Sequence, residues 1–282
     1  MHAEASTASE PAAPRWRPPL MVKASVAWHA GACVAVAAAP AEWPWALAAV
    51  ALNHALLVGT AAWPRSTWLD GNLVRLPEAS AERREVALTF DDGPDPEVTP
   101  RVLDLLDAAH ARATFFPIAE RAQRQPALMR EIVRRGHSVQ NHSQRHAHTF
   151  SLLGPRGLAA EIGAAQQALA DLTGQVPRFF RAPAGVRNPL LGPVLQRLEL
   201  RLVSWTRRGY DTVQRRPARV LHRLVRGLAP GDILLLHDGH AARAADGSPV
   251  SLAVLPEVLA ELSKRGLHAV TLPQAIADPS RA

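Results

Sequence analysis

The decapeptide Glu85-Val-Ala-Leu-Thr-Phe-Asp-Asp-Gly-Pro94 joins a short apolar run to an acidic turn. We expect Val86–Phe90 to form a buried strand, because short apolar runs bounded by turn residues are typical of one. Gly93 and Pro94 then force the chain to turn. Two adjacent carboxylates in a turn point in different directions, so one can bind a metal while the other stays free as a base. Taken alone, the pair would equally suit an Asp-rich surface turn.

The chain beyond this strand repeats an alternation of apolar runs and helical patterns. Several helical stretches end on a glycine, as helices commonly do, at Gly136, Gly174 and Gly266. Seven such alternations predict an α/β fold, either a distorted (β/α) barrel or a doubly wound sheet. The predicted strands are Val86–Phe90, Ala113–Ile118, His137–Asn141, Arg178–Arg181, Arg201–Trp205, Asp232–Leu236 and His268–Leu272. The predicted helices are Thr99–Ala109, Gln125–Arg135, Leu158–Leu172, Pro189–Leu198, Ala218–Gly227 and Leu252–Arg265.

Polar residues that interrupt the apolar pattern come directly after predicted strands. In an α/β barrel the loops after the strands form one face, where catalytic residues collect. We therefore expect these side chains, distant in sequence, to converge on one pocket. They are Asp91, Asp92, His142, His146, Arg181, Asp211 and His237.

Two of these residues, His142 and His146, stand at positions i and i+4. From one helical turn both imidazoles can reach a single ion, with an aspartate as third ligand and water completing an open site. Lone histidines are usually structural, so the prediction depends on the combination with the Asp-Asp turn. A site of this type binds zinc or another divalent ion, acidifies its water and polarises a carbonyl. His237, at the end of a buried strand, suits a general acid that protonates an amine leaving group.

Composition limits the classes of protein that the chain can represent. Its 282 residues are 48% hydrophobic, enough for one large domain with an appendage, which excludes a wholly disordered protein. A single cysteine, Cys33, excludes a disulfide scaffold and a thiolate-rich metal site. The net charge of +7 comes almost entirely from arginine and suits an anionic partner, but charge alone does not identify that partner.

The N-terminal region contains two apolar stretches, Leu20–Ala39 and Trp43–Trp63, each of about the length that crosses a bilayer. We predict a disordered tail over 1–19, a transmembrane helical hairpin over 20–64, a linker over 65–84, a catalytic domain over 85–275 and a tail over 276–282. A signal peptide and a buried soluble helix pair are the alternatives. Basic residues flank both ends of the hairpin, which places the catalytic domain on the cytoplasmic side of the inner membrane.

An arginine-rich segment over 207–226 holds seven arginines and one acid, Asp211. If 218–227 is helical, Arg219, Arg223 and Arg226 share one face. We predict that Arg207, Arg208, Arg219 and Arg223 contact anionic head groups or a lipid-linked phosphate. A solvated helix face is the alternative. No recognition motif accompanies the charge, so we expect no nucleic-acid partner.

Five ordered segments together resemble the motifs of the polysaccharide deacetylase family, carbohydrate esterase family 4. They are Thr89–Pro94, His142–His146, Arg181–Gly185, Trp205–Asp211 and Leu234–Asp238. The resemblance covers about residues 85–275. It implies a distorted (β/α) barrel of about seven strands and a hydrolase acting on carbon–nitrogen, non-peptide bonds in linear amides.

The resemblance also implies a role for each matching residue. It makes Asp91 the general base, His237 the general acid, Arg181 the residue that orients the base and Asp211 the residue that tunes charged partners. Asp92, His142 and His146 would hold a divalent metal, Zn²⁺ first, with Co²⁺, Mn²⁺ or Ni²⁺ as alternatives. Water activated by the metal attacks the amide, and a backbone N–H, that of Ala184, helps to hold the oxyanion. Pro183, Gly185 and Tyr210 complete the expected substrate and oxyanion region.

Two departures from the family pattern concern the substrate groove. The third motif usually carries an aromatic residue where Ala184 stands, and the fourth usually has two acids and a tryptophan, whereas this chain keeps Asp211 but has Arg208 and Thr212 at the other places. We therefore expect an enzyme that removes acetyl or formyl from an amino sugar of a cell-envelope glycan or lipid-linked sugar. The alternatives are an extracytoplasmic peptidoglycan or polysaccharide N-deacetylase, and a non-catalytic carbohydrate-binding module on the same fold.

Overall fold

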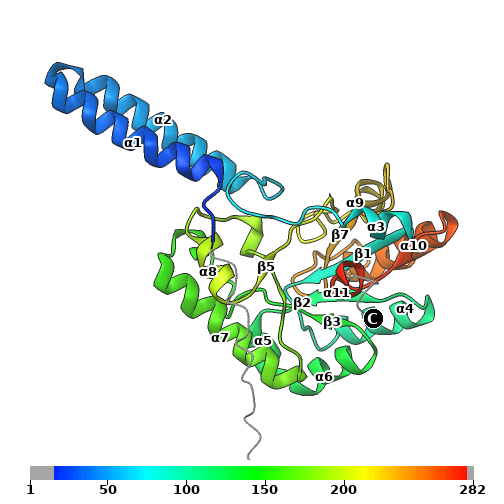
Figure 1. Cartoon of the computed structure of the whole chain (residues 1–282). Coiled ribbons are helices and arrows are strands. Elements are labelled where there is room, and N and C mark those ends of the chain that lie inside the picture. Colours follow the sequence, from blue (N-terminus) through cyan, green and yellow to red (C-terminus); the bar gives the residue numbers. More distant parts are fainter. Residues whose placement is uncertain (1–15, 278–282) are drawn as a thin grey trace, which may run out of the picture.

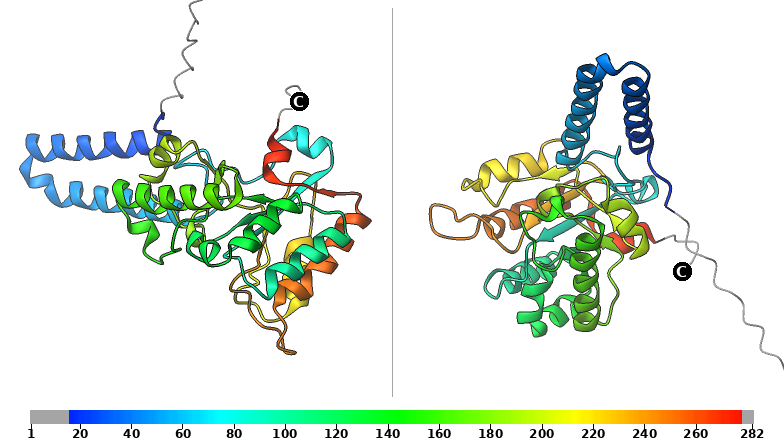
Figure 2. Two further views of the ribbon diagram at one scale, coloured as in Figure 1. Left: turned by 90° about the horizontal axis from the view of Figure 1, so that it is seen from below. Right: turned by 90° about the vertical axis from the view of Figure 1, so that its left-hand side faces the viewer.

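The computed structural model describes residues 16–277 of the chain, as a helical hairpin joined to an α/β body. Figure 1 shows the hairpin projecting from the body, and the right-hand view of Figure 2 shows it standing above the sheet and its covering helices. Of the two predicted tails, residues 1–15 and 278–282 lie outside the described residues.

The sheet of the body is parallel, and strand β1 lies at its centre. The main sheet has six strands. Five of them follow the order β3-β2-β1-β7-β6, and the sixth, β8, pairs with the first two residues of β1. Strands β4 and β5 form a separate pair. A single parallel bridge, Asn141 to Phe180, connects the two sheets. The strands are β1 (Glu85–Asp91), β2 (Ala113–Phe116), β3 (Ser138–Val139), β4 (Phe179–Phe180), β5 (Arg201–Leu202), β6 (Arg207–Arg208), β7 (Ile233–His237) and β8 (His268–Ala269).

The strand prediction differs from the structure in two respects. Within residues 16–277 the ladders do not join all strands into one closed barrel, because β4 and β5 form a separate ladder that only the isolated Asn141–Phe180 bridge links to the main sheet. Strand β6 was not predicted, since it consists of two arginines and has no apolar alternation. Backbone pairing with β7, at Arg207–Leu234 and Arg208–Leu235, stabilises it instead.

The predicted helices of the body are confirmed within about three residues at each end, the usual uncertainty of helix boundaries. Gly136, Gly174 and Gly266 adopt positive φ at or just after helix ends, as expected. Three short helices, α3, α5 and α11, were not predicted. The helices of the body are α3 (Glu78–Glu82), α4 (Val98–Ala108), α5 (Ala119–Arg124), α6 (Pro126–Arg134), α7 (Pro155–Thr173), α8 (Leu191–Arg197), α9 (Pro217–Val225), α10 (Val250–Lys264) and α11 (Leu272–Ile276), with 3₁₀ turns η2 (Phe150–Leu152) and η3 (Pro183–Gly185).

Alternation along β1 and β7 decides which side chains face the site. Leu88 and Phe90 pack into one apolar cluster with Leu234 and Leu236. Residues of the opposite parity, such as Ala87 and Leu235, belong to a second cluster on the other face. Because side chains alternate between faces, Asp91 at the end of β1 and His237 at the end of β7 both lie on this second face.

The hairpin consists of α1 (Leu20–Ala38), turn η1 (Pro40–Glu42) and α2 (Trp43–Ala62). Both helices are long and apolar enough to cross a membrane, and almost all of their surface is exposed. Polar side chains face each other between the helices: Asn53 donates to Ser25 Oγ at 2.8 Å, and the rings of His29 and His54 meet edge to face, 5.1 Å between centroids. Pairing of polar groups in this way is typical of helices that pack together in lipid.

The end of α2 and the residues after it are fixed to the body. The carbonyl of Pro64 accepts from Asn72 Nδ2 at 2.8 Å and from Ser204 Oγ at 2.6 Å. The buried guanidinium of Arg187 binds Asp70 and donates to the carbonyl of Trp63. The segment 65–84 is packed rather than extended, because Leu69, Leu73 and Leu76 are buried, the last two in the second cluster.

Candidate active site

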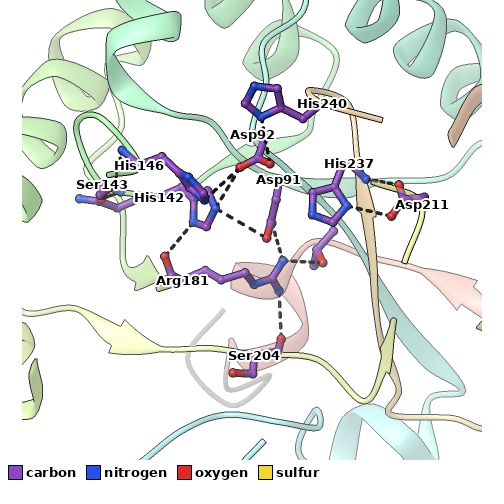
Figure 3. Close-up of polar contacts among 12 residues, drawn as sticks. Asp91, Asp92, His142, Ser143, His146, Arg181, Ser204, Asp211, His237 and His240 are labelled. Carbon is purple, nitrogen blue, oxygen red and sulfur yellow. Dashed lines mark hydrogen bonds and ion pairs between the residues drawn. The ribbon is translucent and has the colours of Figure 1, made fainter. Parts of the chain in front are cut away.

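Asp91 and His237 end adjacent strands and are register partners in the β1–β7 ladder. Both side chains are almost fully buried and both line one cavity of about 530 Å³. Figure 3 shows their side chains converging with those of Asp92, His142 and His146, as the positions after strands predicted.

Arg181, directly after β4, fixes the orientation of Asp91. Its guanidinium is 1% exposed and donates to Asp91 Oδ1 at 2.6 Å, to Thr89 Oγ1 at 2.8 Å and to the carbonyl of Ser204 at 3.0 Å. It also lies 4.2 Å from the ring centroid of Phe116. With Oδ1 engaged, the other carboxylate oxygen of Asp91 points toward His142, 3.9 Å from its Nε2.

Asp92, His142 and His146 form a cluster whose donor atoms all lie within 4.8 Å of one another. Asp92 Oδ1 is 3.3 Å from His142 Nε2 and 3.4 Å from His146 Nε2. The expectation that the two histidines share a helical turn is wrong: the segment is an irregular loop in which Ser143 and His146 have positive φ. The loop nevertheless brings both rings together, with centroids 4.8 Å apart.

The donor set fits a divalent cation. His142 Nδ1 donates to the carbonyl of Arg181 at 2.8 Å, so its Nε2 carries the lone pair in the neutral ring and faces Asp92. Asp92 Oδ1 is buried and accepts no hydrogen bond within the described residues. When the ring is neutral, the lone pair of His142 and the carboxylate oxygen of Asp92 face each other 3.3 Å apart, an arrangement that a proton or a metal cation would relieve.

The titration of the cluster agrees with a cation site. Burial alone would raise the pKa of Asp92, but the imidazoles of His142 and His240 lower it far below its usual range. Burial opposes protonation of His142, yet the carboxylates of Asp91 and Asp92 outweigh it and raise the pKa of His142. Burial and the charge of His142 lower the pKa of His146 to about 4, so His146 is neutral near pH 7. The carboxylates therefore attract positive charge, which a metal ion would supply.

His237 is bound on one side by Asp211. Its Nδ1 donates to Asp211 Oδ1 at 2.8 Å, and its backbone N–H donates to Asp211 Oδ2 at 2.8 Å. Burial lowers the pKa of His237, but the Asp211 carboxylate outweighs this effect and raises that pKa above its ordinary value. Nε2 of His237 is left as the nitrogen able to exchange a proton with a substrate.

The predicted substrate and oxyanion residues do not all line the same cavity. Ala184 and Gly185 line the cavity that holds Asp91 and His237, whereas Pro183 is buried behind it. Ala184 adopts a φ of 54°, and its N–H makes no hydrogen bond within residues 16–277. Tyr210 is not part of this cavity; it lines a neighbouring one, and Arg208 lines both.

Sequence reasoning missed a group of residues behind Asp92. His240 Nδ1 lies 3.4 Å from Asp92 Oδ2, and Arg121 donates to the Asp92 carbonyl at 3.0 Å and contacts His240. The carboxyl of Asp238 accepts from Thr99 Oγ1 at 2.6 Å, and burial raises the pKa of Asp238 to about 7. The signal available in the sequence was His240 itself, three residues after His237.

Gly239 allows the β7 loop to approach Asp92, and this contact gives a first testable prediction. A Cβ at position 239 would overlap the backbone carbonyl of Asp92, which cannot move without carrying the carboxylate with it. We expect Gly239→Ala to weaken metal affinity about 10- to 100-fold, as loss of groups supporting metal ligands does. The measurement is competitive zinc titration with a chromophoric chelator. Gly154→Ala, where a Cβ meets nothing within 4 Å, is the control; equal affinities of the two variants would contradict the prediction.

Comparison with known proteins identifies the class to which this site belongs. Residues 78–203 match the profile of a family described as polysaccharide deacetylase. A peptidoglycan-N-acetylglucosamine deacetylase of Bacillus cereus is 32% identical over 201 residues, covering 71% of this chain and 91% of its own. A chitooligosaccharide deacetylase of Azorhizobium caulinodans is 33% identical over 195 residues, covering 67% of this chain and 92% of its own.

Solved structures agree in fold. A family 4 carbohydrate esterase from Streptomyces lividans, in complex with acetate, is 33% identical with a TM-score of 0.59, covering 66% of this chain and 91% of its own. A family 4 pseudoenzyme from Bacillus anthracis has a TM-score of 0.65 at 20% identity, covering 73% of this chain and 69% of its own, which shows the fold alone.

The chain belongs to the polysaccharide deacetylase family, carbohydrate esterase family 4. It is an enzyme of the sugar N-deacetylase type, a hydrolase acting on carbon–nitrogen bonds in linear amides.

Proposed function

We propose that this enzyme is a membrane-tethered, metal-dependent hydrolase that removes an acetyl or formyl group from an amino sugar, free or lipid-linked. The observation that carries the proposal is the pairing of Asp91 and His237 at the ends of adjacent strands, beside the cluster of Asp92, His142 and His146. Asp91 offers a carboxyl oxygen that Arg181 does not engage, and His237 offers an imidazole whose pKa Asp211 raises; a base and an acid so placed are the pair that amide hydrolysis needs.

Asp92, His142 and His146 would hold the metal, Zn²⁺ in preference to Co²⁺, Mn²⁺ or Ni²⁺, since imidazole and carboxylate ligands suit zinc. A divalent ion so placed acidifies water and polarises the amide carbonyl.

The side chains of the chain then divide the proton transfers between them. The free oxygen of Asp91 takes the proton of the attacking water, while Arg181 holds the other oxygen and keeps the carboxylate in position. His237, whose pKa Asp211 raises, gives a proton to the nitrogen of the leaving amine. Ala184 lines the cavity, and its N–H, which makes no hydrogen bond within residues 16–277, would be the donor to the carbonyl oxygen on which negative charge develops.

The substrate proposal is supported by the relatives and by the hairpin. The names of the relatives describe them as deacetylases of peptidoglycan N-acetylglucosamine and of chitooligosaccharides. In this chain the third-motif loop packs against the hairpin: a Cβ on Gly185 would overlap the ring of Pro64. A cavity so close to the base of two exposed apolar helices is suited to a sugar at the membrane surface.

The experiment that tests the function is acid release from N-acetyl and N-formyl amino sugars by the full-length protein in detergent, with zinc, cobalt or chelator. Free, oligomeric and lipid-linked acceptors are compared. We expect chelator-sensitive release of acetate or formate, with preference for small or lipid-linked acceptors. Equal turnover of long soluble chitin or peptidoglycan strands would refute this preference. Metal loading and sugar binding without release from any acceptor would support the binding-module alternative.

The side of the membrane distinguishes this proposal from the second candidate, an extracytoplasmic peptidoglycan deacetylase. The excess of basic residues at both ends of the hairpin supports a cytoplasmic catalytic domain at the inner membrane. A C-terminal reporter that is active only in the cytoplasm is the expected result. Activity only on the outer side would favour the second candidate, which the relatives' names suggest.

Removing the charge of Asp211 should shift the pH profile. Asp211→Asn removes the carboxylate that raises the pKa of His237, so His237 loses its proton at a lower pH. Because a general acid must be protonated, we expect the alkaline limb of kcat/KM to move to lower pH, with little change in the acid limb. Asp211→Glu should restore most of the wild-type profile. A uniform loss of rate at every pH would indicate a merely structural role.

A further inference from the structure

A second cavity, of about 480 Å³, lies between the active site and the hairpin; we call it the junction cavity. It shares Trp205 and Arg208 with the cavity of Asp91 and His237. Its lining also includes Trp63, Pro64 and Arg65, which follow directly on α2. A molecule that occupied both cavities would therefore run from the catalytic residues to the end of a membrane-spanning helix.

The lining of the junction cavity is strongly basic and contains no acidic residue. Its residues are Trp63, Pro64, Arg65, Trp205, Thr206, Arg207, Arg208, Tyr210, His222, Arg223 and Arg226. Arg207 is already bound to Asp232 and to the carbonyls of Arg226 and Gly227. The other four guanidinium groups have no ion-pair partner within residues 16–277, and the buried Nε of Arg208 has no hydrogen-bond acceptor there. Four arginines with no acidic neighbour in the lining make the cavity attractive to an anion, which would also bind the orphaned Nε of Arg208 if it entered.

The arginines of the junction cavity are held in place by aromatic rings. Arg208 lies between Trp205 and Tyr210, 5.2 and 4.9 Å from their ring centroids, and Arg223 lies 5.0 Å from Tyr210. Gly209 permits this packing, because a Cβ there would meet Val220 of α9 at 2.5 Å. Stacking fixes the planes of the guanidinium groups and leaves their N–H edges free for a ligand. Arg208 and Arg223 are thus oriented by aromatic rings, whereas Arg65 and Arg226 lie exposed at the rim of the cavity lining.

We propose that the junction cavity binds the phosphoryl group of a lipid-linked amino sugar while the acylamino group of the same molecule occupies the active site. Guanidinium groups bind phosphate oxygens in pairs, and several converging arginines suit the two negative charges of a pyrophosphate better than one carboxylate. The lipid leaves past Trp63 along α2. This inference rests on the proposed function and names its substrate class, because the structure puts the anion site on the membrane side of the catalytic residues.

The four arginines predicted to contact anionic head groups have different positions in the structure. Arg208 and Arg223 belong to the junction cavity, with Arg65 and Arg226, which had not been assigned this role from the sequence. Arg207 stabilises the fold through Asp232. Arg219 is exposed on α9 and lines neither cavity, which makes it a matched control on the same helix.

The test compares three N-acetylglucosamine probes on the full-length protein in detergent: the methyl glycoside, the 1-phosphate and a farnesyl-pyrophosphate-linked form. The double variant Arg223→Gln/Arg226→Gln should lower kcat/KM for both phosphorylated probes about 10- to 100-fold, mainly through KM, and leave the methyl glycoside within about twofold. Arg219→Gln should leave all three unchanged. The same loss for all probes in the double variant, or no loss, would overturn the proposal.

Two further measurements test this proposal separately. One does not depend on the proposed deacylase activity, and the other distinguishes a phosphorylated substrate from the phosphate of membrane lipids. Binding of the phosphorylated probes to the metal-loaded Asp91→Asn variant, measured calorimetrically, should weaken about 10- to 100-fold when Arg223 and Arg226 are replaced, even if no probe is turned over. Unchanged binding overturns the proposal independently of activity. Loss of binding to anionic phospholipid vesicles alone, with phosphorylated probes unaffected, would show that the arginines contact membrane head groups and not substrate.

Discussion

Replacing Asp91 by asparagine is expected to lower kcat/KM for an N-acylated amino sugar by about 10²–10⁴-fold, the usual contribution of a general base. The amide can still accept a hydrogen bond from Arg181, but it cannot take a proton from water. Asp91 is not among the three clustered ligands, so metal content should remain near one ion per chain. The measurement is steady-state release of acetate or formate together with metal analysis of the purified variant.

The control for Asp91 lies in the same acidic turn. Asp95 accepts from the backbone N–H groups of Glu97 and Val98 at the start of α4, a role that asparagine can fill. Asp95→Asn should therefore retain activity within about twofold. If Asp91→Asn keeps wild-type activity while binding metal normally, the general base must be another group.

Loss of a metal ligand should lower turnover at least as much as loss of the general base, because the site would no longer retain its metal. We expect His142→Ala to lower zinc affinity by more than about 100-fold, beyond the range seen when only a supporting partner of a ligand is lost, and to abolish turnover at ordinary zinc concentrations. The reason is geometric: His142 is the more buried of the two histidines, and its Nδ1 is held by the carbonyl of Arg181. His268→Ala, an exposed histidine on β8, should bind zinc and turn over as the wild type does.

The pH dependence of metal binding provides an independent check on this ligand. Since Asp91 and Asp92 raise the pKa of His142, protons compete with the metal for this ligand over a wider range of pH than they would for an ordinary histidine. Apparent zinc affinity should therefore fall as pH decreases through that raised pKa and level off above it. Affinity that is independent of pH between about 5 and 8 would contradict the assignment of His142 as a ligand.

Much of the body could be predicted from the sequence because its signals are local. The runs that became β1 and β7 are short, apolar and bounded by turns, and the helices α7 and α10 are long enough for their periodicity to be plain. The convergence of Asp91, His142, Arg181 and His237 followed from one topological rule, that loops after parallel strands share a face.

Other features depend on contacts that leave no local pattern. The loop that carries His142 and His146 is held by Asn141, Ser143 and Glu161 rather than by helical hydrogen bonds, so spacing alone suggested the wrong backbone. The junction cavity combines Arg65 with Arg208 and Arg223, residues far apart in the chain. Neither the backbone of this loop nor the grouping of these arginines could therefore be inferred from the sequence.

The attachment of the hairpin to the body affects any attempt to remove the hairpin and study the catalytic domain alone. A short relay of hydrogen bonds runs inward from the end of α2: Pro64 carbonyl to Ser204 hydroxyl at 2.6 Å, Ser204 carbonyl to Arg181 at 3.0 Å, and Arg181 to Asp91 at 2.6 Å. Cutting the chain at residue 65 would remove the first member of that relay and leave Ser204 without its acceptor. The residues that join the hairpin to the body therefore also hold the catalytic base in position, so the point at which the chain is cut should affect catalysis.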